Sequence, residues 1–597
     1  MKFTLSRRSY SFVLLAALCV FGAQNSHGQQ LYGDKTSSVR PGTGLNRIFS
    51  TNNTYGPLGA ARKVASADNL MLFWSEPPSS AQQGTTPGDA FHFQFMTYLQ
   101  GQPSLPSNQR LAINDSLVGD SVTDAGTGTK YPAIDGSKWS VALAGDMNGD
   151  GNAQAVAVWE TANQQVFATA QPINKSNLSF QNSSVTGNLV GQVDPTPSQF
   201  DGLIHARLAD LNGDGHHELV IAYDGASDGK VHIAVYGYSA SSESHLSLIA
   251  RTSDMSVFTS PAQYYQLIAL ATGDFNGNGH DDIAVAGFKN DGTLYIRLFS
   301  LNSGTTLVAD GEKDLPTSSQ PSSYNPLQLL MAAGDFAGNG SYGLVLAMND
   351  GSNAAVYIAS VDSALDTISV SFNSSYASFA VNQGAGISLD CGDLNATGKE
   401  QIVLGAQNEI FVLAAQPNGS YFLPVQKSNT YVTGASDNSD YLYSTSFIRV
   451  GDVDEDSHAD VVVLRNFYND NGTTALQEMV VNVLGSTDTS FDLSVKATIP
   501  AYMSEYTSDN PDWRRHFDLA LCDINGGLKL GIPTHYYETN IVQPLVILNA
   551  PPVQFDVFND TSYDICDVFN GGRNAGTFVT TYNQSTANTD MMETNVT

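Results

Sequence analysis

One short stretch recurs seven times along this chain and limits what it can fold into. Its clearest copy runs from 209 to 222 and reads ADLNGDGHHELVIA, an oxygen-rich loop that continues into an apolar, β-branched run. If Asp210 is place 1 of the loop, oxygen-bearing side chains stand at places 1, 3, 5 and 9, and glycine stands at place 6. Alternate residues of such a loop point inward, and glycine adopts the positive φ of a sharp turn, so this pattern can wrap a hard cation.

The same register returns six more times. Consecutive place 1 aspartates lie between 58 and 71 residues apart (393 − 335 and 523 − 452). We name the loops first to seventh by these aspartates, which are Asp146, Asp210, Asp274, Asp335, Asp393, Asp452 and Asp523. A repeat of this length indicates one supersecondary unit that is copied along the chain.

Each unit reads as strand, loop, strand, turn, strand and a looser fourth strand. Around the third loop, alternating apolar runs at 265–272, 283–288 and 293–300 predict three strands, and Asn290-Asp291-Gly292 is a strong hairpin signal. Four antiparallel strands in each unit predict an all-β chain, folded as a β-propeller of four-stranded blades with calcium-binding hairpin loops. A β-solenoid is the alternative, although its repeat is usually shorter.

The number of blades stays open between seven and eight. Residues 68–115 look like a unit that has lost its loop, with strands expected at 69–74, 90–99 and 110–113. Seven loops favour seven blades, with strands of this segment closing the ring against the last unit. An eighth blade is the alternative.

The ends of the chain differ from the repeats. Lys2, Arg7 and Arg8 precede an apolar run that ends at Phe21, which predicts a secretory signal peptide and a secreted protein. No later run approaches the length that a membrane span needs. The expected division is a signal peptide at 1–28, a lead-in at 29–64, the propeller at 65–550, and a tail or the start of a further domain at 551–597.

Composition excludes one class of partner. The chain has 27 Lys and Arg against 58 Asp and Glu, a net charge of −31, so it has no basic domain for nucleic acid. After the leader only Cys391, Cys522 and Cys566 remain, too few for a disulfide scaffold. One bridge with a leftover thiol and three buried thiols both fit.

The Gly-Asp-x-Asn-Gly-Asp-Gly loops followed by an apolar strand resemble FG-GAP/VCBS repeats, the unit of the integrin α-subunit head propeller and of many secreted proteins. The resemblance covers residues from about 135 to 550. It implies that the loop joins the innermost strand of a blade to the next strand and binds calcium there. The family includes adhesion receptors, glycan-binding proteins and a few carbohydrate-active enzymes, so the resemblance does not decide an activity.

The loops keep the implied ligand set to different degrees. The second and third are complete, and the sixth is the most acidic although Ser457 replaces its glycine. The first has Gln154 at place 9, and the fifth has Thr397 and Gln401 at places 5 and 9. The predicted metal ligands are Asp146, Asn148, Asp150, Asp210, Asn212, Asp214, Glu218, Asp274, Asn276, Asn278, Asp282, Asp393, Asn395, Asp452, Asp454, Asp456 and Asp460.

Two loops have lost oxygens at places 3 or 5 and at place 9. The fourth has Ala337 and Gly343, and the seventh has Gly527 and Gly531. We interpret these two as turn chemistry, in which side chains cap their own backbone. In the second, third and sixth loops we interpret the carboxylate at place 9 as a calcium ligand, on the ground that only a metal explains it. Three or four Ca²⁺ sites with a structural role are expected.

No zinc motif or other catalytic motif stands out, and His216 and His217 read as solvated loop residues. The leading hypothesis is a non-catalytic binding or cell-adhesion module for an extracellular protein or glycan, without a membrane span. Trp513, Arg514 and Arg515 are the candidates for its ligand face, since aromatic planes with polar groups suit sugars or a protein partner. The alternatives are a polysaccharide lyase-like enzyme and a scaffold for a C-terminal effector outside this sequence.

Overall fold

The computed structural model describes about half of the chain in detail. The described residues are 47–50, 70–75, 91–96, 112–116, 121–132, 140–150, 154–161, 163–174, 179–180, 186–193, 204–225, 228, 230–256, 268–289, 293–315, 328–349, 353–380, 387–406, 409–415, 422–428, 441–451, 458–470, 475–485, 491, 493–506, 520–524, 527–535, 542–549 and 556–557. Every regular element within these ranges is a β-strand, so the predicted all-β class is confirmed. Among the same residues, no helix is long and apolar enough to cross a membrane.

Six successive sheets share one topology. Each has four strands in chain order, and each strand pairs antiparallel with the next. The first three are β12 (Ile204–Ala209), β13 (Glu218–Asp224), β14 (Lys230–Tyr238) and β15 (Leu246–Ser256); β16 (Ala269–Gly273), β17 (Asp282–Phe288), β18 (Leu294–Asn302) and β19 (Thr306–Asp314); and β20 (Gln328–Gly334), β21 (Gly343–Asn349), β22 (Asn353–Val361) and β23 (Ile368–Ala380). The next three are β24 (Ile387–Gly392), β25 (Gln401–Ala406), β26 (Glu409–Ala415) and β27 (Phe422–Ser428); β28 (Tyr441–Gly451), β29 (Asp460–Asp470), β30 (Ala475–Gly485) and β31 (Ser494–Tyr506); and β32 (Ala520–Ile524), β33 (Gly527–His535), β34 (Val542–Asn549) and β35 (Asp556–Val557).

Two further sheets come earlier in the chain. The first has four strands in the same order: β1 (Arg47–Ser50), β2 (Leu70–Ser75), β3 (Phe91–Met96) and β4 (Ala112–Ser116). The second has seven: β5 (Ser121–Asp124), β6 (Lys130–Pro132), β7 (Ser140–Gly145), β8 (Gln154–Glu160), β9 (Gln165–Asn174), β10 (Ser179–Phe180) and β11 (Thr186–Gln192). Its core is again a four-stranded order, β7-β8-β9-β11, to which the β5–β6 hairpin adds through a parallel pairing of β5 with β11.

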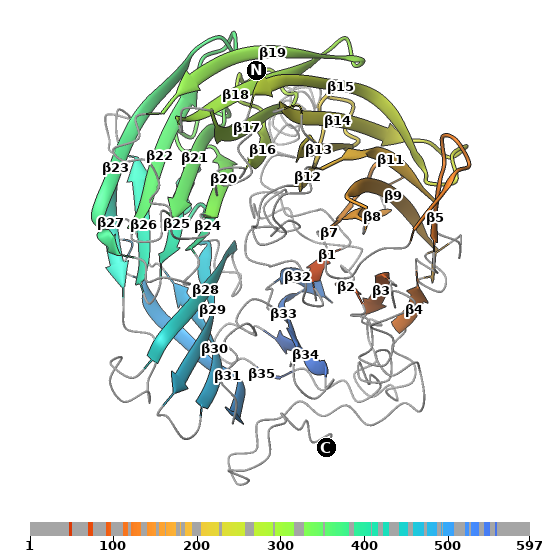
Figure 1. The fold of residues 1–597 in the computed structure, drawn as a ribbon. Coiled ribbons are helices and arrows are strands. Elements are labelled where there is room, and N and C mark those ends of the chain that lie inside the picture. Colours follow the sequence, from red (N-terminus) through yellow and green to blue (C-terminus); the bar gives the residue numbers. More distant parts are fainter. Residues whose placement is uncertain are drawn as a thin grey trace, which may run out of the picture.

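The sheets lie around a common centre, with the leading strand of each sheet toward the inside (Figure 1). Each leading strand contacts the leading strand of the next sheet, in the order β7, β12, β16, β20, β24, β28 and β32. The first strand, β1, contacts both β32 and β7, so the first sheet lies between the last sheet and the second. No sheet among the described residues closes on itself.

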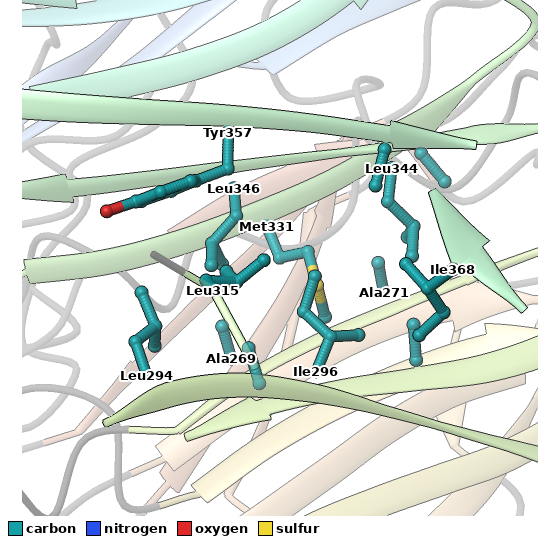
Figure 2. Close-up of a cluster of buried hydrophobic side chains, with 14 of the residues drawn as sticks. Ala269, Ala271, Leu294, Ile296, Leu315, Met331, Leu344, Leu346, Tyr357 and Ile368 are labelled. Atoms are coloured by element: carbon teal, nitrogen blue, oxygen red, sulfur yellow. The ribbon is translucent and has the colours of Figure 1, made fainter. Parts of the chain in front are cut away.

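The hydrophobic core lies between neighbouring sheets, because both faces of the middle strands are covered. All seven residues of β17 are buried. Ile283 and Val285 pack against the sheet of β12–β15, whereas Ala284 and Ala286 on the other face pack against the sheet of β20–β23. Figure 2 shows the second of these clusters, in which Ile296 and Leu294 face Met331 and Leu346. This explains why the second strand of each unit reads as a continuous apolar run rather than an alternating one.

The expected strands are confirmed where they can be checked. The three strands predicted around the third loop are β16, β17 and β18, and the strands predicted within 68–115 are β2, β3 and β4. That segment forms its own sheet together with β1, which supports the eight-unit alternative over the preferred seven. Strands β1 and β35 lie in segments that were expected to be lead-in and tail. The predicted leader at 1–28 lies outside the described residues.

Because the middle strands are buried on both faces, shortening one of their side chains should strongly reduce the free energy of unfolding. Ile283 is fully buried, so Ile283→Ala should lower the free energy of unfolding by about 2–5 kcal/mol. Leu248 on β15 is 46% exposed, and Leu248→Ala should change it by less than about 0.5 kcal/mol. Urea denaturation of the full chain measures both. Equal effects would contradict the core arrangement.

Candidate metal-binding loops

The repeated loop is the hairpin connection between the first and second strand of a sheet. Place 9 is the first residue of the second strand in six loops, and it pairs with the residue just before place 1. These pairs are Gly145↔Gln154, Ala209↔Glu218, Gly273↔Asp282, Gly334↔Gly343, Gly392↔Gln401 and Gly451↔Asp460. The predicted register is therefore a structural register, and places 1 to 8 form the loop itself.

The place 1 aspartate folds each loop around its own carboxylate. In the third loop, Asp274 Oδ1 accepts a hydrogen bond from the Asn278 amide at 2.9 Å, and Oδ2 accepts one from the Gly279 amide at 2.8 Å. The second, fourth and fifth loops have the same two bonds, from places 5 and 6 to place 1. In the first loop, Asp146 Oδ1 accepts from the Gly149 amide at 2.7 Å.

The amide side chain at place 3 adds a second cap. Asn212 Oδ1 accepts a hydrogen bond from the Asp214 amide at 2.9 Å, and Asn276 Oδ1 accepts one from the Asn278 amide at 3.0 Å. Asn148 does the same for Asp150 at 3.1 Å. Asn395 instead accepts from the Thr397 hydroxyl at 2.7 Å. These are the bonds of Asx turns, and they shape the loop without a ligand.

Two places of the loop have positive φ and are mostly glycine, although Ala396 occupies place 4 of the fifth loop at φ +52°. The φ of place 6 is +84° at Gly215, +88° at Gly279 and +82° at Gly340, as its sequence position predicts. Place 4 also has positive φ, which the sequence analysis did not identify although glycine stands there in several loops. Glycine at place 4 also avoids a clash with the following loop: a Cβ at Gly338 would lie 2.8 Å from Lys399 Cγ and 3.0 Å from the Gly398 carbonyl oxygen.

The residue at place 9 binds the loop backbone. Glu218 Oε2 accepts a hydrogen bond from the Leu211 amide at 3.0 Å. Gln154 and Gln401 accept from Met147 and Leu394 at 2.6 and 2.7 Å. An oxygen at place 9 therefore has an explanation other than a metal, which corrects the argument that only a metal explains it. A neutral glutamine suffices for this bond, whereas Glu218 uses its second oxygen as well, since Oε1 accepts a hydrogen bond from the Asn212 side-chain amide at 2.8 Å.

In three loops the place 9 side chain is a buried carboxylate: Glu218, Asp282 and Asp460. Burial raises the pKa of Glu218 and of Asp282 to about 8, with neighbouring carboxylates adding to the effect. Asp282 bonds to the Phe275 amide through its carboxylate, but its Oδ2 is buried and has no hydrogen-bond partner. A buried, unsatisfied carboxylate oxygen costs free energy unless a proton or a cation compensates for it. The third loop thus fits a hard cation chemically, with Asp274, Asn276 and Asn278 as the other donors.

The side chains do not already converge as a coordination shell. Within the described part of the chain, no three Asp, Glu, His or Cys side chains are grouped as a metal site. The oxygens of places 1, 3 and 5 face amides of their own loop instead. Asn148 in the first loop is also hydrogen bonded to Tyr238 of β14.

Successive loops are joined by backbone hydrogen bonds. In each described case the amide at place 8 donates to the place 1 carbonyl oxygen of the preceding loop. The five bonds are His217 to Asp146 at 3.0 Å, Asp281 to Asp210 at 2.9 Å, Tyr342 to Asp274 at 2.8 Å, Glu400 to Asp335 at 3.0 Å and Ala459 to Asp393 at 3.0 Å. Sequence reasoning missed place 8, because its side chain varies and its constant part is the main chain.

The two loop histidines are not equivalent. His216 is about half exposed and lies 3.7 Å from Asp214 Oδ1. His217 is half-buried, its Nδ1 lies 3.1 Å from the Asp146 carbonyl oxygen, and burial lowers its pKa. The expectation that both are solvated is therefore wrong for His217, which belongs to the contact between two loops.

The remaining predicted residues divide as follows. In the fourth loop the Asp335 carboxylate still accepts backbone amides, although places 3 and 9 lack oxygens. This fits the interpretation as turn chemistry. In place of a seventh loop, Asp523 lies within β32 and pairs with Leu528 of β33. In the sixth, Asp460 is buried at the start of β29. Three of its ligands, Asp452, Asp454 and Asp456, lie outside the described residues, as do Trp513, Arg514 and Arg515.

Comparisons with known proteins do not assign a family. No protein-family model matches the sequence, and no curated protein matches it. Among solved structures, the chain is similar to the core factor of S. cerevisiae (9% identity, 70% of this chain and 56% of that chain, TM-score 0.34). It is also similar to a lectin of Aleuria aurantia in complex with α-methyl-L-fucoside (11% identity, 59% and 93%, TM-score 0.27). The chain thus spans about half the length of the core factor chain, and both likenesses are too weak to indicate a function.

The two glycines of the fourth loop separate crowding from backbone strain. Gly338→Ala and Gly340→Ala both place a Cβ at positive φ, which costs about 1–2 kcal/mol. Only Gly338→Ala also meets the following loop, so it should lower the free energy of unfolding by a further ~1–3 kcal/mol. Chemical denaturation of both variants is the measurement. An equal loss would show that the loops do not pack as described.

Proposed function

We propose that this chain is a secreted β-propeller of eight blades that binds structural calcium and acts as a non-catalytic binding module. Support for eight blades comes from the eight sheets of the described residues and from the contacts of β1 with both β32 and β7. A ring of this kind covers the faces of every sheet without a helical layer. The FG-GAP/VCBS resemblance of the loops points to the same architecture.

The calcium proposal rests on Asp282, at place 9 of the third loop. Its Oδ2 is buried and has no hydrogen-bond partner. The second loop supplies Glu218, and the sixth supplies the buried Asp460. Where glutamine stands at place 9, in the first and fifth loops, the same backbone bond forms without charge. We therefore expect calcium first in the third loop, then in the second and sixth, and weakly or not at all in the first and fifth.

A structural role follows from how the loop oxygens are used. Carboxylates at places 1 and 9 bind the loop backbone, and the place 1 carbonyl oxygen binds the next loop. Calcium held by such groups would stabilise the hairpin and offset crowded negative charge, and it would have few positions left for a substrate. Any binding surface would then lie elsewhere on the ring, and its partner would be an extracellular protein or a glycan.

The negative charge of the chain limits the classes of partner that it can bind. A net charge of −31 repels polyanions at low salt, so a neutral glycan or a protein is favoured over an acidic polysaccharide. The same argument disfavours a lyase-like enzyme that acts on acidic polysaccharides. A glycan array combined with a turnover assay on neutral and acidic polysaccharides tests this proposal. Retention of a neutral glycan without product would support it, and release of product would overturn it.

Calcium should stabilise the full chain against unfolding. Ligand that binds only the folded state at 100 times its Kd adds about 2.7 kcal/mol per site, which chelation with EGTA would remove. Thermal unfolding with calcium and with EGTA measures the difference. Asp274→Ala should lower the number of bound ions by one in calorimetric titration.

Asp335→Ala is the matched control for Asp274→Ala. It removes the same capping bonds from the fourth loop, which lacks oxygens at places 3 and 9. It should lower stability while leaving the number of bound calcium ions unchanged. If neither calcium nor EGTA moves the transition, or if Asp335→Ala removes an ion, the calcium assignment is wrong.

A further inference from the structure

The second loop is held by a side chain from the third. Asp281, at place 8 of the third loop, donates its amide to the Asp210 carbonyl oxygen at 2.9 Å. Its own Oδ2 accepts a hydrogen bond from the Asp210 amide at 3.0 Å. The two bonds join one residue to both polar groups of the other main chain, and Asp281 is only 8% exposed. Asp210 therefore has its backbone fixed by the following repeat and its carboxylate fixed by its own loop.

In three other described loops the place 8 side chain makes a different contact. His217 lies with its ring nitrogen against the Asp146 carbonyl oxygen, Tyr342 packs its ring over Gly273, and Glu400 places its carboxylate over Gly334. Each shares the backbone bond to the preceding place 1 residue. The Asp281 carboxylate instead accepts a hydrogen bond from the amide of Asp210, the place 1 residue of the preceding loop.

Asp281 also lies near both place 9 carboxylates. Its charge acts on Glu218 of the second loop and on Asp282 of the third. Asp281 therefore lies between the second loop, whose place 1 backbone it binds, and the place 9 residue of its own loop.

We propose that Asp281 is a positioning residue for the cation site of the second loop, so that this site is completed by the following repeat. This inference rests on the proposed calcium binding. Asp281 fixes the Asp210 main chain, while the Asp210 carboxylate accepts the amides of places 5 and 6, so Asp210 would enter the cation site from a fixed backbone. Outer groups that orient a metal ligand typically affect affinity by about 10–100-fold.

The test is calcium titration calorimetry on the full chain, with Asp281→Asn to separate the hydrogen bond to the Asp210 amide from the charge of the side chain. An Asp274→Ala background removes the third loop's own site. The second loop's contribution is then the part of the isotherm that Asp210→Ala abolishes. Asp281→Ala should weaken that contribution by about 10-fold. Asp281→Asn keeps an acceptor oxygen for the Asp210 amide, so it should weaken binding by less than about 3-fold.

Glu400→Gln is the control, because Glu400 occupies place 8 against the fourth loop, which lacks a complete ligand set. It should leave calcium affinity unchanged. If Asp281→Ala binds as tightly as the background, or if Asp281→Asn loses as much as Asp281→Ala, the positioning role is overturned while calcium binding stands. If the unmodified chain gives no calcium heat and no stabilisation, the proposed function is overturned and this inference with it.

Discussion

The place 1 aspartate connects the whole array of loops. Its carboxylate accepts amides of its own loop, and its carbonyl oxygen accepts the place 8 amide of the next loop. Because the second bond involves only the main chain, side chains at place 8 are free to differ, from histidine to tyrosine to alanine. Local turn chemistry and the joining of neighbouring sheets thus depend on the same residue, and a change at place 1 acts on two sheets at once.

Packing and loop geometry support each other. The sheets bury both faces, so each strand must meet its neighbours on either side at a fixed height. The place 2 residues Met147, Leu211, Phe275, Phe336 and Leu394 are buried beneath the loops. An apolar side chain at place 2 therefore anchors the loop to the core, while the oxygens around it shape the rim.

Whether place 9 indicates a turn or a metal site depends on whether its side chain is charged, not on whether it has an oxygen. Glutamine at place 9 makes the backbone bond as well as glutamate does, since Gln154 and Glu218 both accept from the place 2 amide. A buried carboxylate adds a desolvation cost that glutamine avoids. Glu218 and Asp282 both carry that cost, but of the two only Asp282 has a buried oxygen, Oδ2, without a hydrogen-bond partner, and the calcium proposal for the third loop rests on that oxygen.

Much of the fold could be predicted from the sequence, and the failures have physical causes. The register of the loops, the positive φ of place 6 and the strands around the third loop follow from local chemistry. The segment that forms the sheet of β1–β4 carries no loop signal, so the sequence left the choice between seven and eight units open. At the last sheet only Asn525 and Gly526 separate β32 from β33. Asn-Gly is the strongest signal for a two-residue hairpin, and it outweighs the register of a longer loop.

Contacts between repeats could not be predicted at all. The close approach of Lys399 to Gly338 and the bonds of Asp281 to Asp210 join residues some 60 to 70 positions apart, and one sequence does not show which distant residues meet.

A crystal structure grown in calcium, with anomalous scattering recorded at long wavelength, tests the central claim most directly. The account predicts an anomalous peak in the third loop at about 2.3–2.6 Å from Asp282 Oδ2, and none in the fourth loop. A third loop without a peak, with Asp282 hydrogen bonded only to the protein, would contradict it.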